Sequence, residues 1–189
     1  MAVNAKLVST GKPKKGGAVN LAPSGTTPPT NATSPLEKAF AGLGFCSDAG
    51  LTNNGSRTSE NVKAWGGTIV LTPQTEKQDT FGLTFIESLN VDVLKAVFGP
   101  DNVSGNLEEG IVIQANEQEL PYGVWVVDMV MTDGVAKRVV VPNGKITSID
   151  EIAYTDSGAV GYPVTITGFP DEAGNTHYEY IIKTGEASE

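Results

Sequence analysis

The sequence predicts a mainly β fold, an antiparallel β-sandwich or barrel with one packed α-helix and an extended N-terminal arm. The 189 residues include 22 glycines and 11 prolines, which favour many short elements joined by turns. Short runs rich in β-branched and aromatic residues recur along the chain, and one segment carries the start and stop signals of a helix. With 39% hydrophobic residues the chain can bury one sizeable core, so one principal domain is expected.

The N-terminal segment, residues 1–38, is predicted to be a basic arm or linker in front of a domain over residues 39–189. It holds five of the 13 basic residues and one of the 22 acidic residues, so an arm of positive charge precedes an acidic body. Such an arm can bind nucleic acid, dock on the acidic surface of a neighbouring copy, or remain a solvated tail. The sequence leaves these three interpretations open.

Eleven segments have the composition and the flanking turn residues of strands. In chain order they are 18–22, 43–47, 61–65, 68–74, 80–86, 107–115, 122–131, 135–141, 146–154, 160–168 and 177–183. The polar run 48–59 is predicted to be a long loop, and the charged cluster from Glu76 to Asp79 is predicted to be a hairpin tip. Asp133-Gly134 and Asn143-Gly144 have the chemistry of type I′ turns, which predicts a meander of antiparallel strands.

The helix is predicted at about Asn90–Phe98. Asn90 is a good N-cap, Asp92 places a carboxylate in the first turn, and apolar residues recur on one face. Gly99 and Pro100 end the pattern because neither continues a helix readily.

The residues offer no candidate catalytic, cofactor-binding or metal-binding site, so we expect a protein that is not an enzyme. Cys46 and His177 are the single cysteine and the single histidine, which excludes an internal disulfide and any metal site built on these two residue types. Acidic pairs at 108–109, 150–151 and 171–172 fit surface turns, because adjacent residues on a strand point to opposite faces. No segment approaches the roughly 20 apolar residues of a membrane span, so we expect no membrane insertion.

One region resembles a known family. The run AGLGFCSDAGLTNNGSR at 41–57, followed by ENVKAWGG at 60–67, is similar to the major tail proteins of long-tailed, non-contractile bacteriophages that infect actinobacteria. The segments at 74–81 and 84–99 extend this resemblance, while the C-terminal half matches mainly in the layout of its strands.

The resemblance implies a tail-tube β-sandwich whose copies form homo-hexameric rings that stack into a hollow tube. Double-stranded DNA would pass through this tube during ejection without specific binding. The implied partners are further copies of the chain, a tape measure protein, and the tail terminator and distal tail proteins. The implied location is the virion, after assembly in the cytoplasm of the host bacterium.

In this family an N-terminal arm and an early loop bridge neighbouring rings, and the matching segments here are Lys6–Ala22 and Asp48–Ala64. The implied contact residues are Lys6, Lys12, Lys14, Lys15, Thr52, Asn53, Asn54, Arg57, Glu60, Lys63 and Trp65. Because lysine and arginine would hold the phosphates of passing DNA, we expect acidic residues such as Glu76 and Asp79 to face the channel. The alternative is a soluble β-sandwich module that binds glycans or a host surface through exposed aromatic residues.

Overall fold

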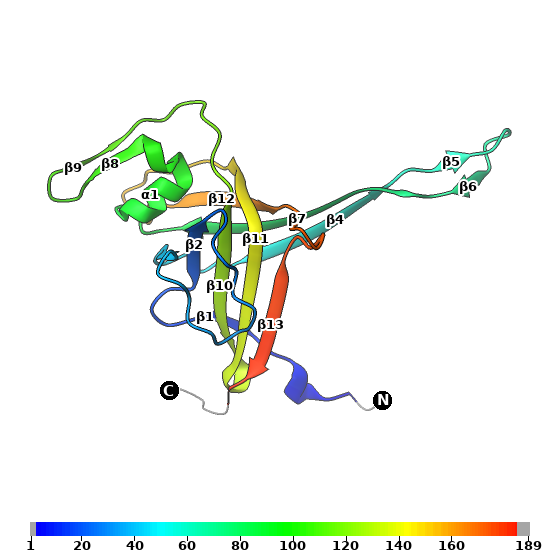
Figure 1. The fold of residues 1–189 in the computed structure, drawn as a ribbon, viewed down its shortest axis with the longest axis horizontal. Coiled ribbons are helices and arrows are strands. Elements are labelled where there is room, and N and C mark those ends of the chain that lie inside the picture. Colours follow the sequence, from blue (N-terminus) through cyan, green and yellow to red (C-terminus); the bar gives the residue numbers. More distant parts are fainter. Residues whose placement is uncertain (1–2, 185–189) are drawn as a thin grey trace.

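A large antiparallel sheet dominates the computed structural model, which describes residues 3–184 (Figure 1). The predicted mainly β fold with one α-helix is confirmed. The sheet runs in the order β3-β2-β10-β11-β12-β7-β4, with β1 also pairing with β10 and β13 with β11. Its strands are β1 (Gly11–Pro13), β2 (Val19–Pro23), β3 (Ala41–Gly42), β4 (Thr52–Ser59), β7 (Gln74–Phe85), β10 (Gly123–Met131), β11 (Val135–Ile149), β12 (Tyr162–Gly168) and β13 (Tyr178–Lys183).

Two small hairpins and a few helical turns complete the structure. The hairpins are β5 (Val62–Lys63) with β6 (Ile69–Leu71), and β8 (Val103–Asn106) with β9 (Gly110–Ile113). Single 3₁₀ turns lie at Ala5–Leu7, Pro100–Asn102 and Thr132–Gly134. The N-terminal segment expected as an arm supplies β1 and β2, and both pair with β10.

The helix α1 (Val91–Phe98) forms where it was predicted. The Asn90 side chain accepts a hydrogen bond from the backbone N–H of Asp92 at 3.0 Å, which satisfies one of the free donors at the helix start. Gly99 closes the last turn at φ 99°, a conformation that costs glycine least. The helix buries Val93, Leu94 and Val97 against the main core.

Strand β10 is buried on both faces, which explains its uninterrupted apolar run. Trp125 and Val127 point into the main core, together with α1 and the inner residues of β7 and β12. Val124 and Val126 point the other way, into a second cluster covered by Leu36 and Phe40 of the loop that follows β2. A strand buried on two sides needs apolar residues at successive positions, whereas a strand buried on one side alternates.

The two predicted type I′ turns differ in outcome. Asp133 and Gly134 both have positive φ, at 58° and 69°, as a type I′ turn requires, and they join β10 to β11. The turn predicted at Asn143-Gly144 is wrong, because both residues lie inside the continuous strand β11 and neither has a positive φ. Register shifts near Gly144 and Ile146 bend this strand, so that it pairs with β13 in its first part and with β12 in its second.

The predicted loop at 48–59 and the predicted hairpin tip at Glu76–Asp79 are also wrong. Residues 52–59 form β4, and β7 begins at Gln74, so the charged cluster lies within a strand. The chain turns instead between β5 and β6, where Gly66 and Gly67 have positive φ. Where these strands extend beyond the core, both of their faces are exposed to solvent. Polar residues therefore occupy positions that a strand with one buried face would fill with apolar residues.

Candidate assembly surfaces

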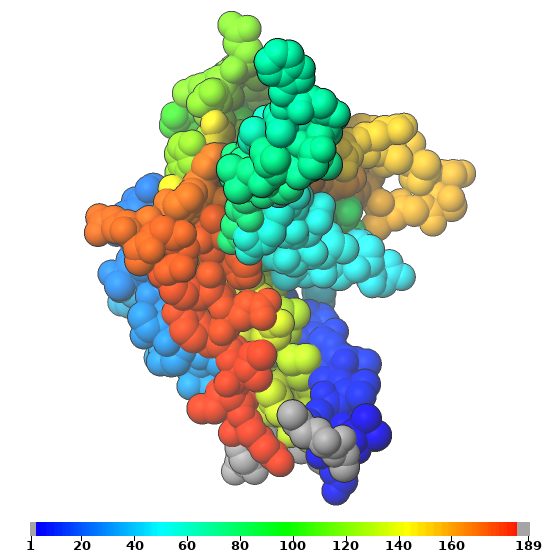
Figure 2. Space-filling model, turned by 90° about the vertical axis from the view of Figure 1, so that its right-hand side faces the viewer, coloured from blue at the N-terminus to red at the C-terminus, as the bar shows by residue number. Residues whose placement is uncertain are grey.

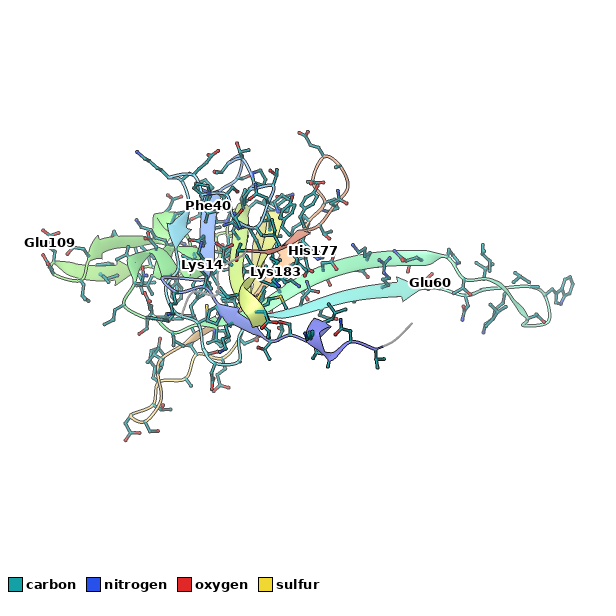
Figure 3. All side chains as sticks on the ribbon, turned by 90° about the horizontal axis from the view of Figure 1, so that it is seen from below. Lys14, Phe40, Glu60, Glu109, His177 and Lys183 are labelled. Atoms are coloured by element: carbon teal, nitrogen blue, oxygen red, sulfur yellow. The ribbon has the colours of Figure 1, made fainter. Side chains whose placement is uncertain are left out.

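A long hairpin made of β4, β5, β6 and β7 projects from the body (Figure 1). The register runs from Thr52 opposite Gly82 to Ser59 opposite Gln74, and every residue from 52 to 78 is exposed. Figure 3 shows Glu60 far out on this hairpin, well away from the packed body. We call residues 60–73 the hairpin tip and the exposed residues 52–59 and 74–78 the stalk.

The hairpin tip carries apolar side chains that the subunit itself does not cover. Val62, Ile69, Val70 and Leu71 are about half exposed or more, and Trp65 is fully exposed at 106%. The stalk, by contrast, is made of threonine, asparagine, serine, glutamine and charged residues, with one glycine at position 55. Clustered apolar side chains at the end of a polar support mark a surface that another molecule covers.

The structure separates the predicted contact residues into two groups. Those of the early segment all lie exposed along the projecting hairpin, and they are Thr52, Asn53, Asn54, Arg57, Glu60, Lys63 and Trp65. The N-terminal lysines lie elsewhere, with Lys6 in the first 3₁₀ turn and Lys12, Lys14 and Lys15 at a cavity of the body. The resemblance implied two bridging segments, and the fold presents them on two separate surfaces.

Asp79 fixes the root of the hairpin from inside the subunit. Its carboxylate is 4% exposed and contacts Lys77 Nζ at 3.0 Å and His177 Nδ1 at 3.4 Å, and it accepts a hydrogen bond from the Thr176 hydroxyl. Burial alone would raise the pKa of this carboxyl, but the hydrogen bonds from Thr176 and Lys77 and the nearby positive charge lower it overall.

Figure 2 shows the hairpin standing above the orange-red C-terminal part of the chain that carries two of these partners. The Asp79 carboxylate is buried and already bound by partners within the subunit. We therefore no longer assign it to the channel wall.

The outer face of the sheet over β4, β7, β12 and β11 is covered by hydroxyl and amide groups. Residues directly opposite each other on paired strands share a face, so the register identifies the members of this surface. They include Thr52, Asn54, Ser56, Gln78, Thr80, Gly82, Thr84, Ser148 and Thr165, with Pro163 opposite Thr84, whereas Thr167 on the same side is buried. None of these side chains carries a charge, and we call this surface the hydroxyl face.

Three charged residues border the hydroxyl face. Asp150 accepts a hydrogen bond from the Ser148 hydroxyl at 3.3 Å. Lys145, opposite Thr167, is bound by Glu119 at 3.0 Å, so its charge is neutralised locally. Glu76 lies on the same face of β7 as Gln78 and Thr80, further out along the stalk, and is exposed. Asp79 has the opposite parity and therefore points to the core side.

A cavity of about 780 Å³ lies between the N-terminal segment and the β10–β11 hairpin. Four lysines line it, Lys12, Lys14, Lys15 and Lys137, together with Met129 and Met131. We call it the lysine cavity. Its residues come from parts of the chain more than 100 positions apart, and the sequence contains no local signal that would have united them.

A buried ion pair supports one wall of the lysine cavity. The guanidinium of Arg138, 1% exposed, donates to both carboxylate oxygens of Asp128, at 2.6 and 3.0 Å. Arg138 also donates to the backbone carbonyls of Asn31 and Ser34, at 3.1 and 2.9 Å. The loop after β2 is thereby fixed to the outside of the sheet, since a buried guanidinium is costly unless its donors are satisfied.

Within residues 3–184, no three or more histidine, cysteine, aspartate or glutamate side chains are grouped as metal ligands would be. In the same range, no helix has both the length and the apolar character that crossing a bilayer demands.

Comparison with known proteins identifies the family. No curated protein matches the chain. Among solved structures, the chain is similar to the anti-feeding prophage cap (AFP tube terminating cap), with 10% identity over 96% of this chain and 100% of that chain and a TM-score of 0.41. A family model described as "Phage tail tube protein" matches residues 2–188. The chain therefore belongs to the phage tail tube protein family, whose members are structural components of the virion that associate with one another and with other tail proteins.

Proposed function

We propose that this chain is the tail-tube subunit of a long-tailed, non-contractile phage of actinobacteria. It forms hexameric rings that stack into a tube, and double-stranded DNA passes through that tube into the host. The observation that carries this proposal is the projecting hairpin with its uncovered apolar tip. In the virion the further partners would be the tape measure protein, the tail terminator and the distal tail proteins, all joined during assembly in the host cytoplasm.

The hairpin has the length and chemistry of a bridge to the next ring. From the root at Asp79 to the turn at Gly67, a strand rise of about 3.3 Å per residue gives a reach of roughly 40 Å, which exceeds the diameter of a small domain. The polar side chains of the stalk remain hydrated over this distance without loss of free energy. The apolar tip gains free energy only when a neighbouring subunit covers it.

The hydroxyl face is our candidate for the channel wall, with Glu76 at its margin. DNA is held mainly by lysine and arginine, which replace the counterions of its phosphates. A wall of threonine, serine and asparagine offers no such charge, and exposed Glu76 repels the backbone. A neutral to acidic surface of this kind lets a polyanion slide.

Thiol labelling of a Thr80→Cys variant tests the position of this wall. The native Cys46 gives little background, because burial, followed by the charge of Glu87, raises the pKa of its thiol to about 11. We expect Cys at position 80 in assembled tubes to react with a small maleimide but not with one attached to a large polymer, whereas free subunits react with both. Reaction with the large reagent in tubes would place this face outside the channel.

Electron microscopy of the purified protein tests the function as a whole. We expect rings or tubes from the wild-type chain and folded, unassembled subunits from a variant in which a two-residue Asn-Gly turn replaces residues 60–73. Circular dichroism of the variant controls for folding, since the deleted residues are exposed. A wild-type protein that stays monomeric at high concentration and binds glycans would favour the alternative of a surface-binding module.

A further inference from the structure

We propose that the tip of the β8–β9 hairpin of one copy occupies the lysine cavity of the next copy. This inference rests on the proposed function and names the two surfaces that join neighbouring subunits. It also gives the positively charged N-terminal segment a defined acidic partner.

The tip of the β8–β9 hairpin combines one apolar and two acidic side chains. Leu107 is 63% exposed, and Glu108 and Glu109 follow it at the apex. The Asn106 carboxamide oxygen accepts hydrogen bonds from the backbone N–H groups of Glu108 and Glu109, both at 2.9 Å, and its nitrogen donates to Glu109 at 2.8 Å. The apex is therefore held in one shape before any partner arrives, which lowers the entropy cost of binding.

Glycines next to the apex allow its two strands to approach closely. Gly105 has φ 85°, and a Cβ there would lie 2.0 Å from the backbone oxygen of Gly110, so the two strands approach more closely than other residues allow. Val112 is also exposed, at 53%, and the hairpin forms a separate two-stranded sheet. Nothing in the larger sheet pairs with it within residues 3–184.

The lysine cavity has the complementary composition. Its wall holds four lysines against two aspartates, Asp128 and Asp133. Asp128 is bound by the buried Arg138 guanidinium and contacts Lys14 at 3.5 Å, and Lys137 contacts Glu179 at 2.9 Å. An ammonium group has three donors, so an ion-paired lysine can still bind an incoming carboxylate. Met129 and Met131 supply flexible apolar surface among these charges, which suits a leucine side chain. An acidic tip that carries one leucine therefore matches the cavity in both charge and apolar character.

The two surfaces cannot meet within one chain. Figure 1 places β8 and β9 at one end of the molecule and β1, which carries Lys12, at another, and Figure 3 shows Glu109 well away from Lys14. A contact between different surfaces of identical chains is heterologous, and such contacts close into rings when the rotation between copies allows it. The pair of surfaces thus supplies the type of contact that a ring of identical subunits needs.

Charge reversal tests this contact. The tip variant carries Glu108→Lys and Glu109→Lys, and the cavity variant carries Lys12→Glu and Lys15→Glu, which keeps the Lys14–Asp128 and Lys137–Glu179 ion pairs. We expect each variant alone to need at least about tenfold more protein to assemble than the wild type, because opposed charges become like charges. A control with Asp156→Lys and Glu172→Lys makes the same charge change as the tip variant on other exposed loops and should assemble as the wild type does.

Mixing the two defective variants gives the decisive result. In an equal mixture the reversed tip meets a reversed cavity and the unaltered tip meets an unaltered one, so we expect assembly to return to within about threefold of the wild type. Assembly of either variant alone at the wild-type concentration would overturn the proposal, and so would a mixture of folded variants that stays unassembled.

Carbodiimide cross-linking of the concentrated wild-type protein provides a second test that needs no variant. Mass spectrometry should find amide bonds between chains joining Glu108 or Glu109 to a lysine of the cavity. This result is expected even if tubes do not form, so the contact and the proposed function can fail separately. Cross-links between chains that involve only other residues would count against the contact.

Discussion

The two tryptophans of the chain allow assembly to be separated from folding. Trp65 at the hairpin tip is fully exposed, so Trp65→Ala should change the free energy of unfolding of the subunit by less than about 0.5 kcal/mol. Trp125 is 3% exposed in the main core, and its indole N–H donates to the Gly144 carbonyl at 3.3 Å. Trp125→Ala should therefore destabilise the subunit by about 3 to 5 kcal/mol.

Assembly, unlike subunit stability, should be strongly weakened by Trp65→Ala. An aromatic side chain that becomes buried at an interface covers about 150 to 250 Å², which at about 25 cal/mol per Å² sets an upper limit of roughly 4 to 6 kcal/mol. Truncation of an aromatic hot spot commonly costs about 2 to 4 kcal/mol, equivalent to about 30- to 700-fold in the concentration needed. The two lines of reasoning therefore give the same order of magnitude.

Sedimentation against protein concentration measures assembly, and thermal unfolding of the unassembled subunit measures stability. Tubes from the Trp65→Ala variant at the wild-type concentration would refute the role given to the hairpin tip. A loss of subunit stability as large as that caused by Trp125→Ala would show instead that Trp65 contributes to folding.

Other predictions concern the subunit. Arg138→Met should lower the free energy of unfolding by about 3 to 5 kcal/mol in urea titrations, because it removes both guanidinium hydrogen bonds from the buried Asp128 carboxylate and leaves it only the longer contact with Lys14. Because the pKa of Asp79 is lower in the folded than in the unfolded chain, its contribution to stability is complete above the ordinary value of 3.8 and is lost as the pH falls through the folded value. The stability difference between the wild type and Asp79→Asn should therefore shrink in acid, and a difference independent of pH would contradict this. Gly134→Val should cost about 1 to 2 kcal/mol in the same titrations, because φ is 69° there. Alkylation of Cys46 should remain slow at pH 8 and accelerate toward pH 11, and fast labelling at pH 8 would contradict its burial.

Local signals predicted the elements that local chemistry determines. The cap at Asn90 and the glycine after Phe98 bound the helix, and Asp133-Gly134 forms its turn because both residues adopt positive φ. Asn143-Gly144 has the same turn chemistry but lies in a strand. There the pairing of β11 with strands on both sides outweighs the turn preference of a dipeptide.

The assembly surfaces could not be predicted from the local sequence alone. The stalk has no core on either face, so its residues lack the alternation that reveals a strand, and the tip was predicted at Glu76 to Asp79 instead of at the turn after Trp65. The lysine cavity joins residues near position 12 to residues near position 131, a juxtaposition that β1 creates by pairing with β10. The contrast between Glu76 and Asp79 follows from strand parity, which applies only once both residues are known to lie within β7.

A cryo-electron microscopy reconstruction of the assembled wild-type protein tests the central claim most directly. We predict stacked rings of six subunits in which the hairpin tip, with Trp65 buried, lies against a subunit of the adjacent ring. A map in which residues 60–73 extend into solvent, or particles that remain single subunits at the concentrations found in phage-producing cells, would contradict this account.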